Sequence, residues 1–248
     1  RQLRFPEREP TLAIAADGAY LSPRGALNVP VAAMNVRACE VALRRVSGGN
    51  VVFCANGHNR YDEGLKRLGA PAVTRQLTLP DTPNRENKFY VNLRDLAGAE
   101  PAGVYHLAVS YKVAGSEWPR ETGRLLVVTD LGLSAKVAKD GVLVWVNSLR
   151  TAQPVADGEV VLYAHNNQEL GRGRTDAQGL LFLPCQTADV PEELKPSLVT
   201  AARAGDLSYL AFENGRVGIL DNGVGPYLDG GCEAFLFSDR GVYRPGET

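Results

Sequence analysis

The stretch "GLSAKVAKDGVLVWVNSL", residues 132–149, decides the fold class of this chain. Two apolar segments flank Asp140-Gly141. An Asp-Gly pair is one of the strongest signals of a tight β-hairpin, because glycine adopts the positive φ that such turns require. The segment therefore predicts a strand, a two-residue turn and a second strand, with Trp145 buried on the second strand.

Similar signals continue on the C-terminal side of this hairpin. A turn signal recurs about every 8–12 residues, a spacing typical of an all-β sandwich. Short strands cannot bury both faces alone, so we expect two sheets to pack face to face. The further predicted strands are "EVVLYAH" (159–165), "ELGRGRT" (169–175) paired with "LLFLP" (180–184), and "SLVTAARAG" (197–205) paired with "DLSYLAFE" (206–213).

The N-terminal half carries the same kind of pattern. In "RACEVALRRV", residues 37–46, the side chains of Cys39, Val41 and Leu43 fall on one face, and the charged residues Glu40 and Arg44 fall on the other. This alternation is typical of a half-buried strand.

A turn and two short helical segments complete the predicted secondary structure. "SGGN" (47–50) predicts a turn from which "VVFC" (51–54) returns as a strand. "RYDEGLKRLGA" (60–70) predicts a short helix, and "PEELKPS" (191–197) predicts a single helical turn.

Composition supports a packed β protein and excludes several classes of function. Of the 248 residues 44% are hydrophobic, and 26 glycines and 15 prolines are spread along the chain. The net charge of −1 provides no basic field for nucleic acid or for an anionic membrane surface. The longest apolar runs span a few residues, far short of the ~18–20 that cross a bilayer, so we expect no transmembrane segment.

The sequence divides into two blocks. The boundary falls in "RLLVVTDLGLS" (124–134), where one strand leads directly into the next without a flexible linker. We therefore predict one module over residues 1–124 and a second over 125–234, lying against each other.

Four cysteines, Cys39, Cys54, Cys185 and Cys232, raise the question of disulfides. None belongs to a C-x-x-C pair and the histidines lie far apart in sequence, so we expect no metal site. An even number fits two disulfides and an oxidising compartment. The alternative is four buried thiols in a cytosolic protein.

The predicted pairing is one bridge within each module, Cys39–Cys54 and Cys185–Cys232. A strict two-residue loop at Gly48-Gly49 would place Cys54 opposite Leu43. That leaves ~13 Å along the strand between the two thiols, which a disulfide cannot span unless the returning segment curls. The other connectivities, which link the two modules, stay open.

Signals of catalysis are missing from the sequence. There is no Gly-x-Ser-x-Gly elbow, phosphate-binding loop or His-Glu-x-x-His helix. "GRGR" (171–174) is interpreted as an edge strand beside a turn rather than a phosphate loop, and His165 as a solvated turn residue rather than a base. We therefore expect no enzyme, no catalytic residue and no cofactor.

The final stretch, "FLFSDRGVYRPGET" (235–248), carries a resemblance to a known family. It resembles the opening of a macroglobulin-like domain in the alpha-2-macroglobulins, especially the bacterial ones. Pro245 and Gly246 suit the two central positions of a type II turn. The motif is structural, not catalytic, and its residues are Asp239, Arg240, Tyr243, Arg244, Pro245 and Gly246.

Three further segments look like parts of such domains. "VVTDLGLSAK" (127–136) resembles the entry to an early macroglobulin domain, and residues 151–184 resemble its body. Residues 27–54 resemble the preceding domain, more loosely. The resemblance implies tandem antiparallel β-sandwiches of the macroglobulin-like type (immunoglobulin-like or fibronectin-like) over 1–124 and 125–234, followed by the first strand and turn of a third, truncated domain over 235–248.

The resemblance also implies a function for the whole protein. Alpha-2-macroglobulins inhibit proteases by bait and trap, in host or bacterial defence. These residues would be structural scaffold modules, since the chain has neither an evident bait loop nor the Cys-Leu-Glu-Gln context of a thioester. The alternative function is a cell-surface adhesin or receptor-type binding module built of immunoglobulin-like repeats, since sandwiches serve many functions.

Partners and location follow from the same resemblance. Proteases would bind through parts of the protein outside this chain, and cell-wall synthases or other periplasmic proteins are further expected partners. The resemblance implies a periplasmic protein anchored to the inner membrane through a lipidated cysteine upstream of Arg1.

Overall fold

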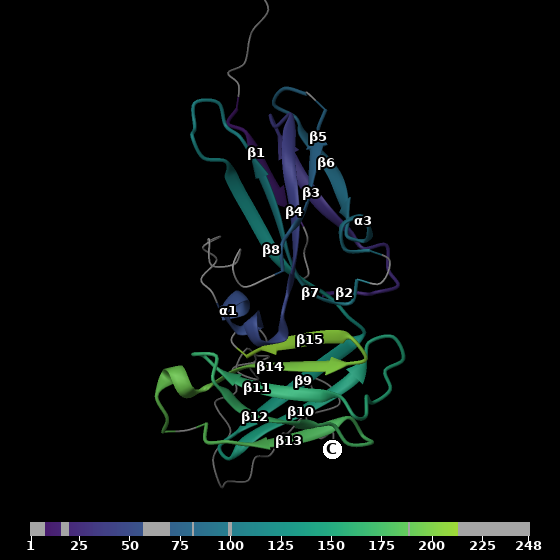
Figure 1. Ribbon diagram of the computed structural model, residues 1–248, viewed down its shortest axis with the longest axis vertical. Coiled ribbons are helices and arrows are strands. Elements are labelled where there is room, and N and C mark those ends of the chain that lie inside the picture. The colour runs from purple at the N-terminus through teal and green to yellow at the C-terminus, as the bar shows by residue number, and fades with distance from the viewer. Residues whose placement is uncertain are drawn as a thin grey trace, which may run out of the picture. The chain divides into compact units, whose positions relative to one another are not determined.

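The computed structural model describes residues 8–15, 20–56, 70–80, 82–98, 101–187 and 189–212 (Figure 1). These residues belong to one compact unit, residues 1–214. Most of the described elements are β-strands, which confirms the all-β prediction. Residues 60–69 of the helix predicted over 60–70, Cys232 and the family motif at 239–246 lie outside the described residues.

The first half of the unit is a β-sandwich of two antiparallel sheets, apart from the short parallel pairing of β2 with β8. One sheet has the order β1-β3-β6 and the other has the order β2-β8-β7-β4-β5. The strands are β1 (Thr11–Ile14), β2 (Tyr20–Leu21), β3 (Asn28–Met34), β4 (Ala38–Val46), β5 (Val73–Thr78), β6 (Glu86–Asn92), β7 (Gly103–Tyr111) and β8 (Arg120–Val128). Short helices are η1 (Gly48–Asn50), α1 (Val51–Asn56) and α3 (Arg94–Ala97).

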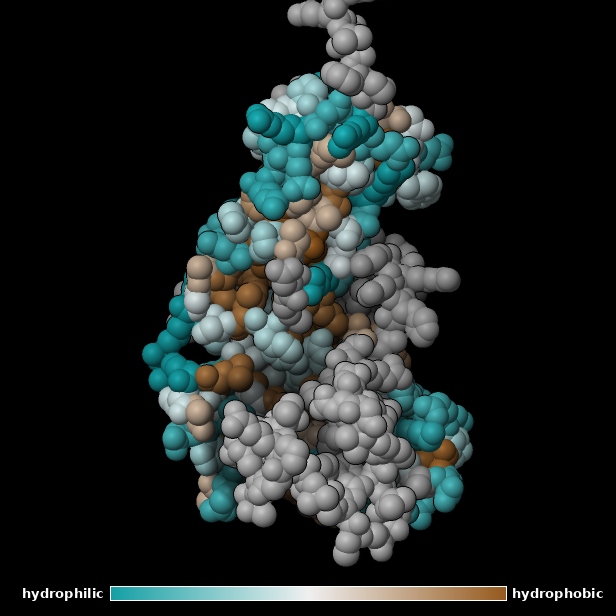
Figure 2. All heavy atoms as spheres, turned by 180° about the vertical axis from the view of Figure 1, so that it is seen from behind, coloured by the Kyte–Doolittle hydropathy of each residue, from teal (hydrophilic) through white to brown (hydrophobic). Residues whose placement is uncertain are grey.

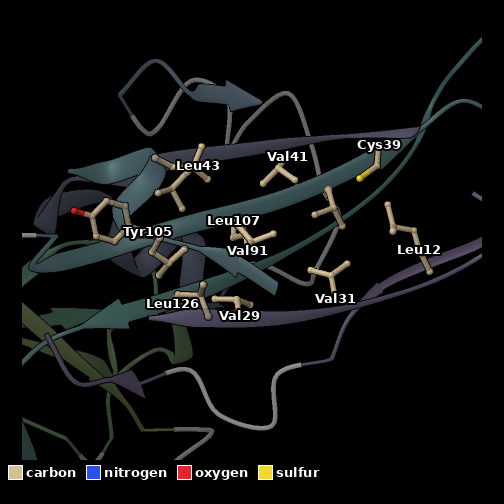
Figure 3. Close-up of a cluster of buried hydrophobic side chains, with 14 of the residues drawn as sticks. Leu12, Val29, Val31, Cys39, Val41, Leu43, Val91, Tyr105, Leu107 and Leu126 are labelled. Carbon is tan, nitrogen blue, oxygen red and sulfur yellow. The ribbon is translucent and has the colours of Figure 1, made fainter. Parts of the chain in front are cut away.

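The core of this sandwich lies between its two sheets. Figure 3 shows Val29 and Val31 of β3 facing Leu107 of β7 and Leu126 of β8. Cys39, Val41 and Leu43 of β4 all point into this core, so the predicted alternation along the strand is confirmed. Because strand side chains alternate with period two, one pattern of three apolar residues was enough to place the inner face of β4.

The second half is another sandwich, with sheets β13-β10-β9 and β12-β11-β14-β15. The predicted hairpin is confirmed, with β9 and β10 paired antiparallel along their whole length, but its turn lies one residue earlier than predicted, at Lys139-Asp140. Gly141 pairs with Ala138 as the first residue of β10 and does not have the positive φ that was expected of it. The hairpin around Gly205-Asp206 is confirmed as β14 and β15. The elements are β9 (Leu131–Ala138), β10 (Gly141–Ser148), β11 (Glu159–Ala164), β12 (Glu169–Arg174), β13 (Leu180–Pro184), η2 (Glu192–Leu194), β14 (Pro196–Arg203) and β15 (Asp206–Ala211).

The predicted pairing of 169–175 with 180–184 is wrong. β12 pairs with β11, whereas β13 pairs with β10 in the opposite sheet. The turn at Asp176–Gly179 exists, with the Gly179 amide donating to the Asp176 carbonyl at 3.0 Å. This turn carries the chain from one sheet to the other, and just before it the hydroxyl of buried Thr175 donates to the Val155 carbonyl and accepts from the Gly158 amide. A turn signal is local and does not specify which sheet receives the next strand.

The segment "VVFC" is a helix and not a returning strand. Ser47–Asn50 forms a tight turn, with the Asn50 amide bonded to the Ser47 carbonyl at 2.9 Å, and this turn leads straight into α1. Val51 and Val52 are fully buried against the second sandwich. Tertiary burial therefore overrides the strand preference of two β-branched residues. The helical turn predicted in 191–197 is confirmed as η2.

Cys39, Cys54 and Cys185 are free thiols in the structure, so the predicted Cys39–Cys54 bridge is not formed. Cys39 lies near the start of β4, whereas Cys54 follows the opposite end of that strand, in α1. Seven residues of strand, ~23 Å, separate Cys39 from Val46, and the helix does not fold back along the strand. Because Cys185 is also a free thiol, the predicted Cys185–Cys232 bridge is not formed either.

The free thiols lead to a first testable prediction. Burial raises the pKa of Cys54 to about 11, which lowers its thiolate fraction at pH 8 by about 100-fold relative to an ordinary thiol near 9. We expect iodoacetamide to label Cys54 at least tenfold more slowly in the native chain than in the chain unfolded in guanidinium. Mass spectrometry of the labelled peptides measures both rates. Equal rates, or a mass showing oxidised Cys39 and Cys54 in one bridge, would contradict the structure.

Strand pairing shows where the chain passes from one sandwich to the other. All of β8, from Arg120 to Val128, pairs with β7. After two intervening residues, β9 begins at Leu131 in the second sandwich. The module ends predicted at residues 124 and 234 remain predictions, and residue 234 lies outside the described part of the chain.

Candidate functional site: the contact between the two sandwiches

An apolar cluster joins the two sandwiches. From the first sandwich it contains the ends of three strands and the start of α1; from the second it contains the outer face of the sheet that carries β14 and β15 (Figure 1). Leu198 of β14 is fully buried in this cluster. The buried members are Val46, Val51, Val52, Val104, Val127, Leu198 and Ala211, with Cys54, Ala55, Leu125, Tyr163, Leu207 and Tyr209 packed beside them. We call this cluster the junction.

The link between the sandwiches is two residues long and is fixed at both residues. The amide of buried Thr129 donates to the Leu21 carbonyl at 3.1 Å. The Asp130 amide donates to the carboxylate of Asp206, at the start of β15, at 2.8 Å. A short, hydrogen-bonded link leaves little freedom for one sandwich to swing relative to the other.

The side chain of Asp130 organises the neighbouring turn. One carboxylate oxygen accepts from the Ser148 hydroxyl at 2.7 Å, and the other accepts from the Arg150 amide at 2.9 Å. The Asp130 carbonyl accepts from the Leu149 amide at 2.7 Å. Asp130 thus connects the link, β15 and the turn after β10 through hydrogen bonds to a charged group, which are stronger than neutral ones.

Polar contacts surround the apolar cluster. The Tyr20 hydroxyl donates to the Tyr209 carbonyl, and the two rings lie 6.4 Å apart at 37°. The Asn167 amide donates to the Gly49 carbonyl at 3.0 Å. Burial raises the pKa of Tyr209 to about 12 and also raises the pKa of Tyr20, so both phenols are neutral at physiological pH.

A buried histidine lies on the outer face of the first sandwich's larger sheet. His106 of β7 is cross-strand from Arg44 and is buried. Its ring lies against Gly123 of β8: a methyl group at Gly123 would come within 2.5 Å of His106 Nε2. Burial, followed by the charge of Arg44, lowers the pKa of His106. Nε2 has no hydrogen-bond partner in the structure.

A pH prediction follows for His106. Because its pKa in the folded state lies below its ordinary value near 6.5, protons bind the unfolded chain more readily. The stability that the neutral imidazole of His106 contributes is complete above about pH 6.5. It is lost as the pH falls below that value, by at most about 1.4 kcal/mol per pH unit. We expect the free energy of unfolding, measured in urea at pH 7.5 and 5.5, to fall less for His106→Gln than for the unchanged chain. Carboxylates common to both proteins cancel in the comparison, and equal falls would contradict the prediction.

No group of three or more His, Cys, Asp or Glu side chains suited to a metal occurs among the described residues. The predicted edge strand "GRGR" is confirmed as β12, at the edge of its sheet. Its arginines are engaged in ion pairs, Arg172 with Glu159 and Glu169, and Arg174 with Asp157.

An open cleft of about 810 Å³ lies in the first sandwich. Its lining carries side chains of both charges, including Arg37, Glu40 and Lys112. The thiol in this lining, Cys39, is 2% exposed, and burial raises its pKa, which disfavours the reactive thiolate form. Seen from behind, the upper part of the coloured surface is largely hydrophilic, with apolar atoms gathered at mid-height (Figure 2). No described helix has the length and hydropathy of a membrane span.

The sequence did not locate the junction residues. They come from both halves of the chain, and their closeness depends on the crossing at Thr129–Asp130. One signal was available: β14, "PSLVTAAR", reads as an almost continuous apolar run, which is typical of a strand buried on both faces. The structure shows this, since Leu198 lies in the junction and Val199 lies in the core of the second sandwich.

Comparison with known proteins shows which proteins this chain is similar to. Residues 128–226 match the family model described as the bacterial alpha-2-macroglobulin MG3 domain. A curated relative, the alpha-2-macroglobulin homolog of Yersinia pestis, is 27% identical over 280 residues, with 99% of this chain covered. The chain is similar to bacterial alpha-2-macroglobulins along nearly its whole length.

Solved structures from bacterial alpha-2-macroglobulins share the fold. The crystal structure of native Escherichia coli alpha-2-macroglobulin spanning domains NIE-MG1 has a TM-score of 0.62 and 22% identity, covering 83% of this chain and 98% of that one. The crystal structure of a Salmonella alpha-2-macroglobulin mutant has a TM-score of 0.62 and 20% identity, covering 90% of this chain and 13% of that one. The chain spans about one seventh of the length of the curated alpha-2-macroglobulins it matches, 14% for the Yersinia pestis protein.

Proposed function

We propose that this chain supplies two scaffold modules of a bacterial alpha-2-macroglobulin-like protease inhibitor that works by bait and trap. The bait region and any thioester belong to other parts of that protein. The observation that carries the proposal is the junction, a buried apolar contact reinforced by the two-residue link, in a chain similar to bacterial alpha-2-macroglobulins. Such a contact makes two sandwiches move as one body, which is what a frame around a cleavable bait requires.

The proposal gives these modules no chemistry of their own. Proteases interact with other parts of the protein, and the chain itself is not an enzyme. We further propose a periplasmic location with an anchor at a lipidated N-terminus, and contact with cell-wall synthases or other periplasmic proteins. The relatives in the comparisons are alpha-2-macroglobulins, which favours this function over an adhesin or receptor module.

The test uses the full-length polypeptide that contains this chain. A trapped protease should still cleave a small chromogenic peptide but should cleave a large protein substrate at least about tenfold more slowly, since the trap excludes large substrates. The 248-residue chain alone should change neither rate and should form no covalent adduct. The proposal fails if full-length protein slows neither reaction, or if the chain alone binds and inhibits the protease. Cell fractionation with a periplasmic marker tests the location separately.

A further inference from the structure

The outer face of the β9–β10–β13 sheet carries an exposed apolar surface. Leu143 and Trp145 of β10 lie opposite Phe182 and Leu180 of β13, forming two adjacent cross-strand pairs. Each of these four side chains is between 36% and 45% exposed. We call these four residues the apolar block. The expectation that Trp145 is buried in the core is therefore wrong: Val142, Val144 and Val146 fill the inner face of β10 instead, and Trp145 lies outside.

The apolar surface continues along the sheet beyond the block. Leu149 is exposed and lies over Gly132, where an added methyl group would come within 2.7 Å of its Cδ2 atom. The ring of Phe182 lies over Gly141 in the same way, at 2.6 Å. The one charged neighbour in register with the block is Lys136 of β9, opposite Leu143. β10 is thus apolar on both faces, a pattern typical of strands covered on both sides.

The same sandwich shows what covers such a face. On its other sheet the outward side chains Tyr163, Leu198 and Ala211 are apolar too, and the first sandwich packs on them to form the junction. Leu198 is completely buried there, whereas Leu143 on the opposite sheet is 38% exposed. In this chain, a neighbouring β-sandwich is the partner that an outward apolar sheet face receives.

We propose that the apolar block is a docking surface for a further β-module of the same polypeptide, so that both sheets of the second sandwich pack against neighbours. This inference rests on the proposed function, in which the chain is part of a longer alpha-2-macroglobulin-like protein. The matched relatives are about seven times as long as the segment this chain covers, which leaves many residues to provide such a module. The partner surface is apolar, with an acidic side chain near Lys136.

Charge argues against two other occupants. A second copy packed face to face across a twofold axis would bring two Lys136 ammonium groups into one small apolar contact, and like charges there are unfavourable. An anionic membrane has little to attract it, because the chain has a net charge of −1 and the block has a single basic neighbour.

The experiment places a photo-cross-linking amino acid, p-benzoylphenylalanine, at Phe182 of the full-length polypeptide. We expect a cross-link to a peptide outside residues 1–248 of the same polypeptide, with a yield that does not change over a roughly 100-fold range of protein concentration. The matched control carries the same amino acid at Tyr90, an exposed aromatic residue of β6, and should not reach that peptide. Cross-linked dimers whose yield rises with concentration, or cross-links to lipid, would overturn the inference.

A second measurement covers the case in which the cross-linker reacts poorly. A cysteine at Leu143 (Leu143→Cys) is labelled with iodoacetamide in the full-length polypeptide and in the 248-residue chain. We expect labelling at least about tenfold slower in the full-length polypeptide, because the docked module covers the block. Equal rates would overturn the inference. Protease inhibition measured on the same preparation separates the two ideas: inhibition with an open block refutes the docking surface alone, whereas a covered block without inhibition refutes the proposed function alone.

Discussion

Replacing Gly179 with alanine is expected to destabilise the second sandwich by more than about 3 kcal/mol. Gly179 has a φ of +74°, which costs an alanine about 1–2 kcal/mol. The larger cost is steric. The added methyl carbon would lie 2.4 Å from the Val146 carbonyl oxygen and 3.1 Å from both Pro154 Cβ and the Val155 amide nitrogen. Two of these three neighbours are backbone atoms, so relief requires moving a strand.

The matched control is Gly205→Ala, at the β14–β15 turn. Gly205 has a similar φ of +85°, but a methyl group there meets no atom within 4 Å in the structure. We expect it to cost only the backbone term of about 1–2 kcal/mol. Urea unfolding followed by far-ultraviolet circular dichroism gives both free energies. Equal losses for the two variants would show that the turn at Asp176–Gly179 does not press against β10 as the structure has it.

The turn at Gly179 also marks how far the sequence could predict the fold. Turn signals and alternation identified β4, the β9–β10 hairpin and the β14–β15 hairpin, because these features depend on neighbours in sequence. The same signals could not predict that the chain leaves one sheet after β12 and enters the other at β13. The crossing involves contacts distant in sequence, such as those of the Thr175 hydroxyl with residues 17 and 20 positions away.

Two other differences between the structure and the predictions from sequence have one physical cause. Val51 and Val52 favour strands by propensity, and Trp145 lies in an apolar run, so each was assigned by local character alone. In the structure, Val51 and Val52 form a helix because they are buried in the junction, and Trp145 faces outward because the inner face of β10 is already filled by valines. Burial by a distant segment overrides local preference, and a single sequence does not show which segment will provide it.

The junction is where a substitution should weaken the contact between the sandwiches most. Leu198→Ala removes a fully buried side chain of the junction and leaves a cavity there. Such truncations cost about 2–5 kcal/mol. The control is Leu143→Ala on the opposite sheet of the same sandwich, where the side chain is partly exposed and the expected loss is under about 1 kcal/mol.

A double-mutant cycle distinguishes weakening of the contact from general loss of stability. If Leu198 and Val127 stabilise one shared contact, Leu198→Ala combined with Val127→Ala should deviate from additivity by about 0.5–3 kcal/mol. Leu162→Ala, in the separate core of the second sandwich, should be additive with Val127→Ala to within about 0.5 kcal/mol. Additivity in both pairs would mean that Leu198 and Val127 do not stabilise a shared contact, and would contradict the junction as the coupling between the two sandwiches.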